Sequence, residues 1–207
     1  MMLPTHALGG MVLALPLFAV APEYASVALV AGLVGGIFPD LDLYVGHRKT
    51  LHYPVYYSAF AVVAAVIALF VPTIATVSVT VFLLGAAVHC LSDILGSGLE
   101  LRPWEGTSER AVYDHYRDTW IAPRQLITYD GSPADLCLSG VLAIPLLYAL
   151  DGFFQWIVIG AIAVAVVYTA LRRLLADLAA VVFGVLPKTV RPYVPERYLE
   201  DLEAPPT

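Results

Sequence analysis

The sequence predicts an all-α fold, a polytopic membrane helix bundle of about six transmembrane helices. Of the 207 residues, 59% are hydrophobic and 14% are charged, whereas soluble domains carry about 45–50% and about 25%. The mean hydropathy is +0.78. Long charge-free runs, and lysines and arginines that fall on one side of the predicted membrane, also indicate a membrane protein.

Five stretches of the chain contain no Asp, Glu, Lys or Arg, and they define the predicted helices in order. A helix needs roughly 20 apolar residues, in a range of about 17–25, to cross the hydrocarbon core of a bilayer. The stretches are 1–22, 24–39, 50–92, 136–150 and 152–171, of which the second and fourth are short. The third is too long for one helix, and Pro72-Thr73 divides it into a hairpin at about 54–71 and 74–95, which gives six helices.

Two of these helices carry further signals. Ala19-Val20-Ala21 resembles a signal-peptidase site, but no positive charge precedes the first run and a proline follows the site, so a membrane span is predicted there. In the second run, Gly32 and Gly36 fit the small-xxx-small pattern of close helix packing. Glycine is also frequent in membrane helices for no such reason, and both interpretations stay open.

The lysines and arginines predict the orientation. With six helices and a cytoplasmic N-terminus, all eleven of them fall on the cytoplasmic side, as the positive-inside rule requires. The predicted location is therefore the cell membrane, multi-pass, with both termini and the 96–133 loop in the cytoplasm. Residues 1–186 form the predicted helical domain, in which 174–186 continue the last helix or lie at the interface. Residues 187–207 form a predicted flexible tail.

Net charge and cysteine content exclude several functions. The net charge of −6 leaves no basic surface for nucleic acid, so membrane lipid is the expected partner. Cys90 and Cys137 form no CxxC pair and predict neither a disulfide framework nor a thiolate metal site.

Seven ionisable side chains lie at or near predicted helix ends, although membrane segments avoid such groups. The predicted topology brings all seven to the cytoplasmic face, where imidazole and carboxylate together suit Zn²⁺, Fe²⁺ or Mn²⁺. His89 and Asp93 lie four residues apart on one helix face. The expected ligands are His6, Asp40, His52, His89 and Asp93, all within residues 1–95, and the expected orienting groups or general bases are Asp42 and His47.

Most of these residues also allow a plainer interpretation. Asp40 and Asp42 could simply end a helix in water, and His47 could face lipid headgroups beside Arg48 and Lys49. His6 could be an interfacial residue by chance. In the loops, His115 is expected to be solvated, and Asp135 is either a helix cap or a group behind the metal ligands.

The order of these short motifs resembles the YdjM-like family of inner-membrane, metal-dependent hydrolases. The similar segments are Thr5-His6, Phe38-Pro39-Asp40-Leu41-Asp42, His47-Arg48 with His52, His89-x-x-x-Asp93 and Arg102-Pro103-Trp104, which span about residues 1–105. Where the family has Gly-x-Thr-His-Ser, this chain has Lys49-Thr50-Leu51-His52-Tyr53, so the histidine spacing is kept and the flanking threonine and serine are not. The resemblance implies a prokaryotic membrane hydrolase that uses a divalent metal.

The expected function is therefore hydrolysis of a phosphoester or lipid headgroup bond by a membrane-embedded metal site, with zinc the first choice of metal. Two alternatives remain open: an ion, proton or small-molecule transporter, because buried ionisable groups also form ion pathways, and a scaffold with a structural metal. Aromatic and basic residues of the 96–133 loop could dock a phosphate or merely satisfy the positive-inside rule: Arg102, Trp104, Arg110, Arg117, Trp120 and Arg124.

Overall fold

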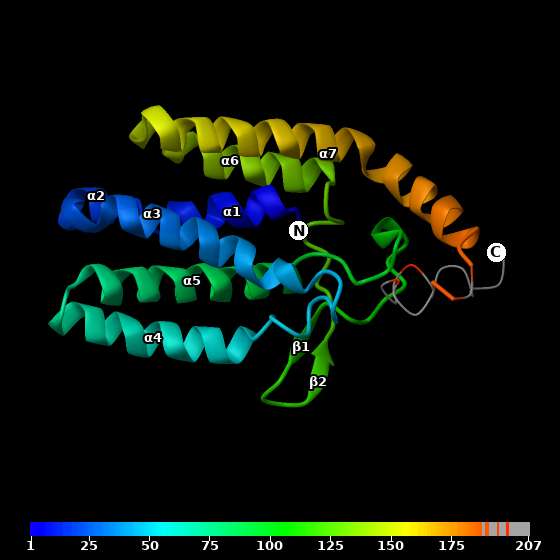
Figure 1. The fold of residues 1–207 in the computed structure, drawn as a ribbon, viewed down its shortest axis with the longest axis horizontal. Coiled ribbons are helices and arrows are strands. Elements are labelled where there is room, and N and C mark those ends of the chain that lie inside the picture. Colours follow the sequence, from blue (N-terminus) through cyan, green and yellow to red (C-terminus); the bar gives the residue numbers. More distant parts are fainter. Residues whose placement is uncertain (188, 191–193, 195–197, 199–207) are drawn as a thin grey trace.

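The computed structural model describes residues 1–187, 189, 190, 194 and 198, and it shows an up-and-down bundle of helices with a loop region at one end (Figure 1). The helices in chain order are α1 (Leu3–Val12), α2 (Leu17–Val20), α3 (Pro22–Ile37), the 3-10 helix η1 (Phe38–Asp42), α4 (Pro54–Phe70), α5 (Ile74–Ile94), the 3-10 helix η2 (Pro103–Glu105), α6 (Pro133–Ala149) and α7 (Gly152–Gly184). Within the described residues, four segments are long and apolar enough to cross a membrane: Leu3–Val20, Pro22–Asp42, Ile74–Ile94 and Gly152–Gly184. The apolar helices α4 and α6 are shorter, with 17 residues each.

The first apolar run folds as two helices rather than one. α1 ends at Val12 and is connected to α2 by tight turns. In these turns a backbone N–H donates to the carbonyl oxygen three residues earlier, for example Leu17 N to Ala14 O. Pro16 lies in this connection and has no N–H to donate to a helix. The chain still crosses the bundle once over this stretch, and the direction reverses at α3.

Glycines bring α1, α3 and α5 into backbone contact. A methyl group added to Gly10 of α1 would overlap the carbonyl oxygen of Gly32 in α3, and one added to Gly36 would overlap the carbonyl oxygen of His6. A methyl group on Gly35 would likewise meet the backbone of Phe82 in α5. Gly32 and Gly36 therefore form a close packing contact, as small residues do between membrane helices.

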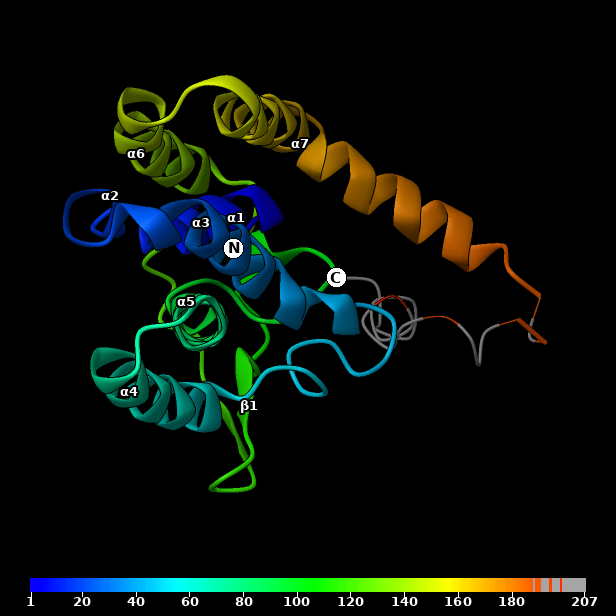
Figure 2. The ribbon, with the colours of Figure 1, turned by 60° about the vertical axis from the view of Figure 1, so that its left-hand side comes forward.

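The helices α6 and α7 cover the other side of α1 (Figure 1). A buried apolar cluster joins these layers: Leu8, Met11, Leu29, Val81, Leu146 and Val158. α7 runs without interruption past Arg172 and Arg173, so the segment after them continues the helix. At 33 residues and 1.5 Å per residue it is about 50 Å long, and its last turns project beyond the other helices (Figure 2).

The loop between α5 and α6 contains the only strands among the described residues. β1 (Val112–Asp114) and β2 (Thr119–Ile121) form a short antiparallel hairpin in which Tyr113 pairs with Trp120. A purely helical fold is therefore incomplete as a description of this chain, although the membrane-length elements are all helices. Most of the predicted flexible tail, residues 188, 191–193, 195–197 and 199–207, lies outside the described residues.

Candidate metal centre

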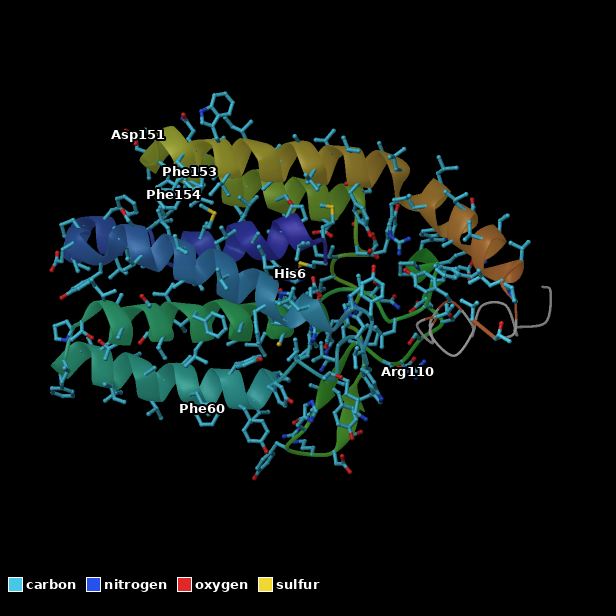
Figure 3. The ribbon with its side chains drawn as sticks, in the orientation of Figure 1. His6, Phe60, Arg110, Asp151, Phe153 and Phe154 are labelled. Carbon is cyan, nitrogen blue, oxygen red and sulfur yellow. The ribbon has the colours of Figure 1, made fainter. Side chains whose placement is uncertain are left out.

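Three chain segments deliver four polar side chains to the loop end of the bundle, where Figure 3 also places His6. α3 passes directly into η1, and Pro39, which fits the first turn of a helix, is followed by Asp40. The loop from η1 to α4 supplies His52 two residues before Pro54 begins α4. The last turns of α5 supply His89 and Asp93 on one face. Asp151, Phe153 and Phe154 mark the opposite end of the bundle in the same view.

These four residues form a His2Asp2 group that could bind a metal ion. One ligand atom from each of Asp40, His52, His89 and Asp93 lies within 4.8 Å of the others. His89 Nε2 is 3.4 Å from Asp40 Oδ1 and 3.5 Å from Asp93 Oδ2, and His52 Nε2 is 3.9 Å from Asp40 Oδ1 and 3.5 Å from Asp93 Oδ2. A tetrahedral site with bonds of about 2.1 Å separates its ligand atoms by about 3.4 Å, so the spacing suits a small cation.

Asp42 fixes the orientation of His52. Its Oδ2 lies 2.9 Å from His52 Nδ1, and because a carboxylate only accepts hydrogen bonds, Nδ1 carries the proton. The other ring nitrogen, Nε2, then faces Asp40 and Asp93. Asp42 also accepts hydrogen bonds from His47 Nδ1 and from the backbone N–H groups of Arg48 and Leu51. Because four donors occupy its two oxygens, Asp42 is not available as a ligand and contributes to the His2Asp2 group by positioning His52.

A backbone carbonyl does the same for His89. His89 Nδ1 donates to Gly36 O at 2.6 Å, which leaves Nε2 directed at the two carboxylates. Glycines allow α3 and α5 to approach closely enough for this contact, because a methyl group on Gly35 would overlap the Phe82 carbonyl oxygen and one on Gly85 would lie 3.0 Å from Gly36 N. The packing of α1, α3 and α5 thus sets the ligand geometry, and hydrogen bonds of this kind fix the tautomer of metal-ligating histidines.

Burial supports the assignment of a cation. His52 Nε2 and His89 Nε2 are buried and have no hydrogen-bond partner among the described residues. A buried acceptor without a donor is costly, and here each faces carboxylate oxygens that are also acceptors. A metal ion would resolve the conflict. The side chain of Asp40 is 20% exposed, whereas the other three are at most 1% exposed, so solvent reaches the group beside Asp40.

His6 lies against the group without joining its four atoms. Its Nε2 is 3.1 Å from Asp93 Oδ1, the oxygen that also binds the Met1 ammonium at 2.6 Å, while Asp93 Oδ2 faces His52 and His89. The His6 ring stacks on His89 with centroids 3.7 Å apart, and Ser92 Oγ contacts its Nδ1. This arrangement positions Asp93 and His89 through His6 and does not present His6 as a fifth ligand.

The other sequence-predicted residues lie around the group at increasing distance. His47 is held by Asp42 Oδ1 at 3.0 Å and its ring meets His52 edge-on. His115 contacts the Lys49 carbonyl oxygen and stacks on Tyr53, so it is tied to the loop and not simply solvated. Asp135 is fully buried, but it binds the N-terminal segment through Met2 N and Thr5 Oγ1 and is not part of the four-residue group.

Three of the four arginines of the 96–133 loop have partners away from the group. Arg102 pairs with Asp177 of α7, Arg110 stacks on Trp120, and Arg117 pairs with Asp114. The basic residue that does reach the group is Arg48, whose Nε is 3.4 Å from Asp93 Oδ2. The sequence analysis did not predict a site role for Arg48, because Arg48 and Lys49 together look like ordinary basic residues of a cytoplasmic loop. The position of Arg48 next to His47 was the available indication.

The chain was compared with family models, curated proteins and solved structures. No family model matches the chain, and no curated protein or solved structure is significantly similar to it.

Proposed function

We propose that this chain is a membrane-embedded, metal-dependent hydrolase that cleaves a phosphoester or lipid headgroup bond at the cytoplasmic membrane face. The observation that carries the proposal is a pair of buried nitrogens, His52 Nε2 and His89 Nε2, that have no hydrogen-bond partner in the described part of the chain. They face Asp40 and Asp93 at 3.4–3.9 Å. Zinc is the proposed metal, with manganese or iron as substitutes, because two imidazoles and two carboxylates suit all three. When bound, such a metal lowers the pKa of a coordinated water toward about 7 and polarises the scissile group.

The depth of the group favours hydrolysis over transport. Asp40 follows the last residue of α3 by three positions, His52 precedes α4, and Asp93 is the penultimate residue of α5. Transport sites lie near the bilayer midplane between broken helices, whereas this group lies at one end of the bundle. A site at that level meets lipid headgroups, and the partly exposed Asp40 side chain provides access for water.

The proposed membrane arrangement has six crossings with both termini in the cytoplasm. The up-and-down course of the chain (Figure 1) and the apolar lengths of its helices support this, and so does the one-sided placement of lysine and arginine. The order of the His and Asp motifs, which resembles the YdjM-like family, supports the same reaction class. A scaffold with a structural metal is the competing proposal.

Within this reaction, water adds to phosphorus, the P–O bond to the alcohol breaks, and a proton reaches the leaving oxygen. His47 is the proposed proton carrier, because its imidazole is oriented by Asp42 and its side chain is 14% exposed. Asp42 is proposed as the positioning residue for His47 and His52 and not as a base, because both of its oxygens accept hydrogen bonds.

The test is release of phosphate or headgroup from phospholipid vesicles that contain the reconstituted, zinc-loaded protein. We expect turnover by the wild type, none by His89→Ala, and full turnover by His115→Ala, a matched histidine whose contacts are Lys49 and Tyr53. Stoichiometric metal without turnover on any phospholipid class would replace the hydrolase with the scaffold.

A further inference from the structure

Arg48 is held in a backbone conformation that a residue with a side chain seldom adopts. Its φ is 60°, in the left-handed region. The backbone is fixed on both sides, since Arg48 N donates to Asp42 Oδ1 and Arg48 O accepts from Tyr113 N of β1. A strained residue held by its surroundings is a recurrent feature of functional sites, so the position of this side chain requires an explanation.

The Arg48 guanidinium is buried beside the metal group. The residue is 5% exposed, and Nη1 donates to Ser97 O at 2.7 Å. Its Nε lies 3.4 Å from Asp93 Oδ2, the same oxygen that faces His52 and His89, and makes no hydrogen bond to any described residue. The structure thus places an incompletely satisfied guanidinium next to a predicted ligand oxygen.

Charge makes this placement informative. A guanidinium keeps its positive charge in proteins, and a divalent cation on Asp93 Oδ2 would lie within a few ångströms of it. Asp93 Oδ2 lies against both positive charges, but Asp40 and Asp93 together carry two negative charges against the three of the metal and the guanidinium. An anion bound beside both cations would offset the remaining repulsion. Arginine is the residue that best matches the oxygens of a phosphoryl group, through its planar fork of N–H donors.

We propose that Arg48 binds the phosphoryl group of the substrate beside the metal and makes this site specific for a phosphoester anion. The inference rests on the proposed function, whose phosphoester it specifies. Arg48 is therefore a substrate-binding residue and not only a partner that neutralises Asp93.

Calorimetric titration of the full-length, zinc-loaded protein with inorganic phosphate tests the proposal, with metal content measured on the same samples. The main variant is Arg48→Gly, because glycine accepts a positive φ and removes the guanidinium without adding strain. Arg48→Lys keeps the charge but not the fork. The control is Arg117→Gly, an arginine whose side chain is 77% exposed in the hairpin.

We expect Arg48→Gly to keep its zinc and to bind phosphate about 10- to 100-fold more weakly. Arg48→Lys should lie between it and the wild type, and Arg117→Gly should equal the wild type. Unchanged phosphate affinity in zinc-loaded Arg48→Gly would overturn the proposal and leave the metal site standing. Loss of zinc from Arg48→Gly would also overturn it, by making Arg48 part of the metal scaffold. A wild type without zinc would overturn the proposed function itself.

Competition identifies the source of the phosphoryl group. Dihexanoyl phosphatidic acid and glycerol 3-phosphate carry the same phosphoryl group with and without acyl chains. Displacement of phosphate by both at equal affinity supports Arg48 as a site for a free phosphoester, and tighter displacement by the lipid supports a headgroup. Displacement by neither, at any concentration up to 100 times that of the phosphate, would contradict a phosphoester site.

Discussion

Two buried carboxylate clusters lie at the same end of the bundle, and they differ in how completely they are satisfied. Asp135 in α6 accepts hydrogen bonds from Met2 N, Thr5 Oγ1 and Gly131 N, at 2.6–3.1 Å, and Thr5 Oγ1 also contacts Ser139. The cluster of Asp40 and Asp93 instead faces two imidazole nitrogens that have no hydrogen-bond partner among the described residues.

In the proposed metal site, this difference separates a structural carboxylate from a metal ligand. Around Asp135 the chain supplies a donor for each oxygen, so the cluster closes on itself and fixes the N-terminal segment to α6. Around Asp93, the ring nitrogens of His52 and His89 face a carboxylate oxygen at 3.5 Å, an arrangement that a cation between them would stabilise. Buried polar groups are nearly always hydrogen-bonded in native proteins, so the second cluster requires something that the chain does not supply.

The largest expected effect is on metal content. We expect His52→Ala and His89→Ala to lose stoichiometric zinc while keeping wild-type helicity by circular dichroism, because each removes one of four ligand atoms. His6→Gln should keep its zinc, because the His6 ring binds Asp93 Oδ1 and not the four-atom group. Loss of zinc from His6→Gln to the same degree would make His6 a fifth ligand.

A smaller effect on zinc binding is expected from Asp42, which contacts the proposed ligand His52. Asp42→Asn replaces an acceptor oxygen with an amide that cannot accept, so His47 or His52 loses its partner. We expect zinc affinity to fall about 10- to 100-fold, the usual cost of altering a group behind a metal ligand. Competition with a chromophoric chelator measures the affinity, and an unchanged value would show that Asp42 does not position His52.

Substitutions in the Asp135 cluster should lower the stability of the protein and leave its zinc content unchanged. Asp135→Ala leaves three donors without their acceptor, and we expect it to lower the free energy of unfolding by about 2–4 kcal/mol. Asp135→Asn should cost less, because one acceptor oxygen remains. Thermal unfolding in detergent measures the change. Zinc per folded molecule should equal the wild type, and a parallel loss of zinc would erase the distinction between the two clusters.

The smallest effect is a pH dependence next to the closed cluster. Burial disfavours the charged form of Asp130, but the Arg172 guanidinium outweighs burial and lowers the pKa of the Asp130 carboxyl. Arg172 binds both oxygens of Asp130 at 3.0 Å. The stability from this ion pair is therefore complete above the unfolded pKa of about 3.9 and is lost as the pH falls through the lower folded value.

The fluorescence of Trp104 reports this transition, because Arg172 and Arg173 lie over its ring. In a Trp120→Phe, Trp156→Phe background, we expect the Trp104 emission to change below pH 4. The matched Asp130→Asn protein should lack that step. An identical pH profile for the two proteins would assign the transition to other carboxylates.

Much of the helical bundle could be predicted from the sequence, because apolar runs and prolines act locally. Pro72-Thr73 correctly divides the 50–92 stretch, since α4 ends at Phe70 and α5 begins at Ile74. The hairpin of β1 and β2 was missed. Its signal was the β-forming residues Val112-Tyr113 and Thr119-Trp120-Ile121 around a turn, but strands of three residues are too short to stand out in a charged loop.

The gathering of polar groups at one end followed from topology alone, whereas their roles did not. Asp40 and Asp42 are two residues apart in η1, and only the conformation of the following loop decides that Asp40 faces His89 while Asp42 faces His52. The contact of His6 with Asp93 depends on α1 meeting α3 at Gly36, a long-range contact that no local pattern contains.

Metal analysis combined with X-ray absorption spectroscopy of the purified wild-type protein tests the central claim most directly. We predict at least one tightly held divalent transition metal per chain, with nitrogen and oxygen neighbours at about 2.0–2.2 Å and no sulfur neighbour at about 2.3 Å. The His89→Ala protein, purified and analysed in the same way, should contain no bound divalent metal. Protein that stays free of metal after equilibration with zinc, or that holds zinc equally well without His89, would contradict the account.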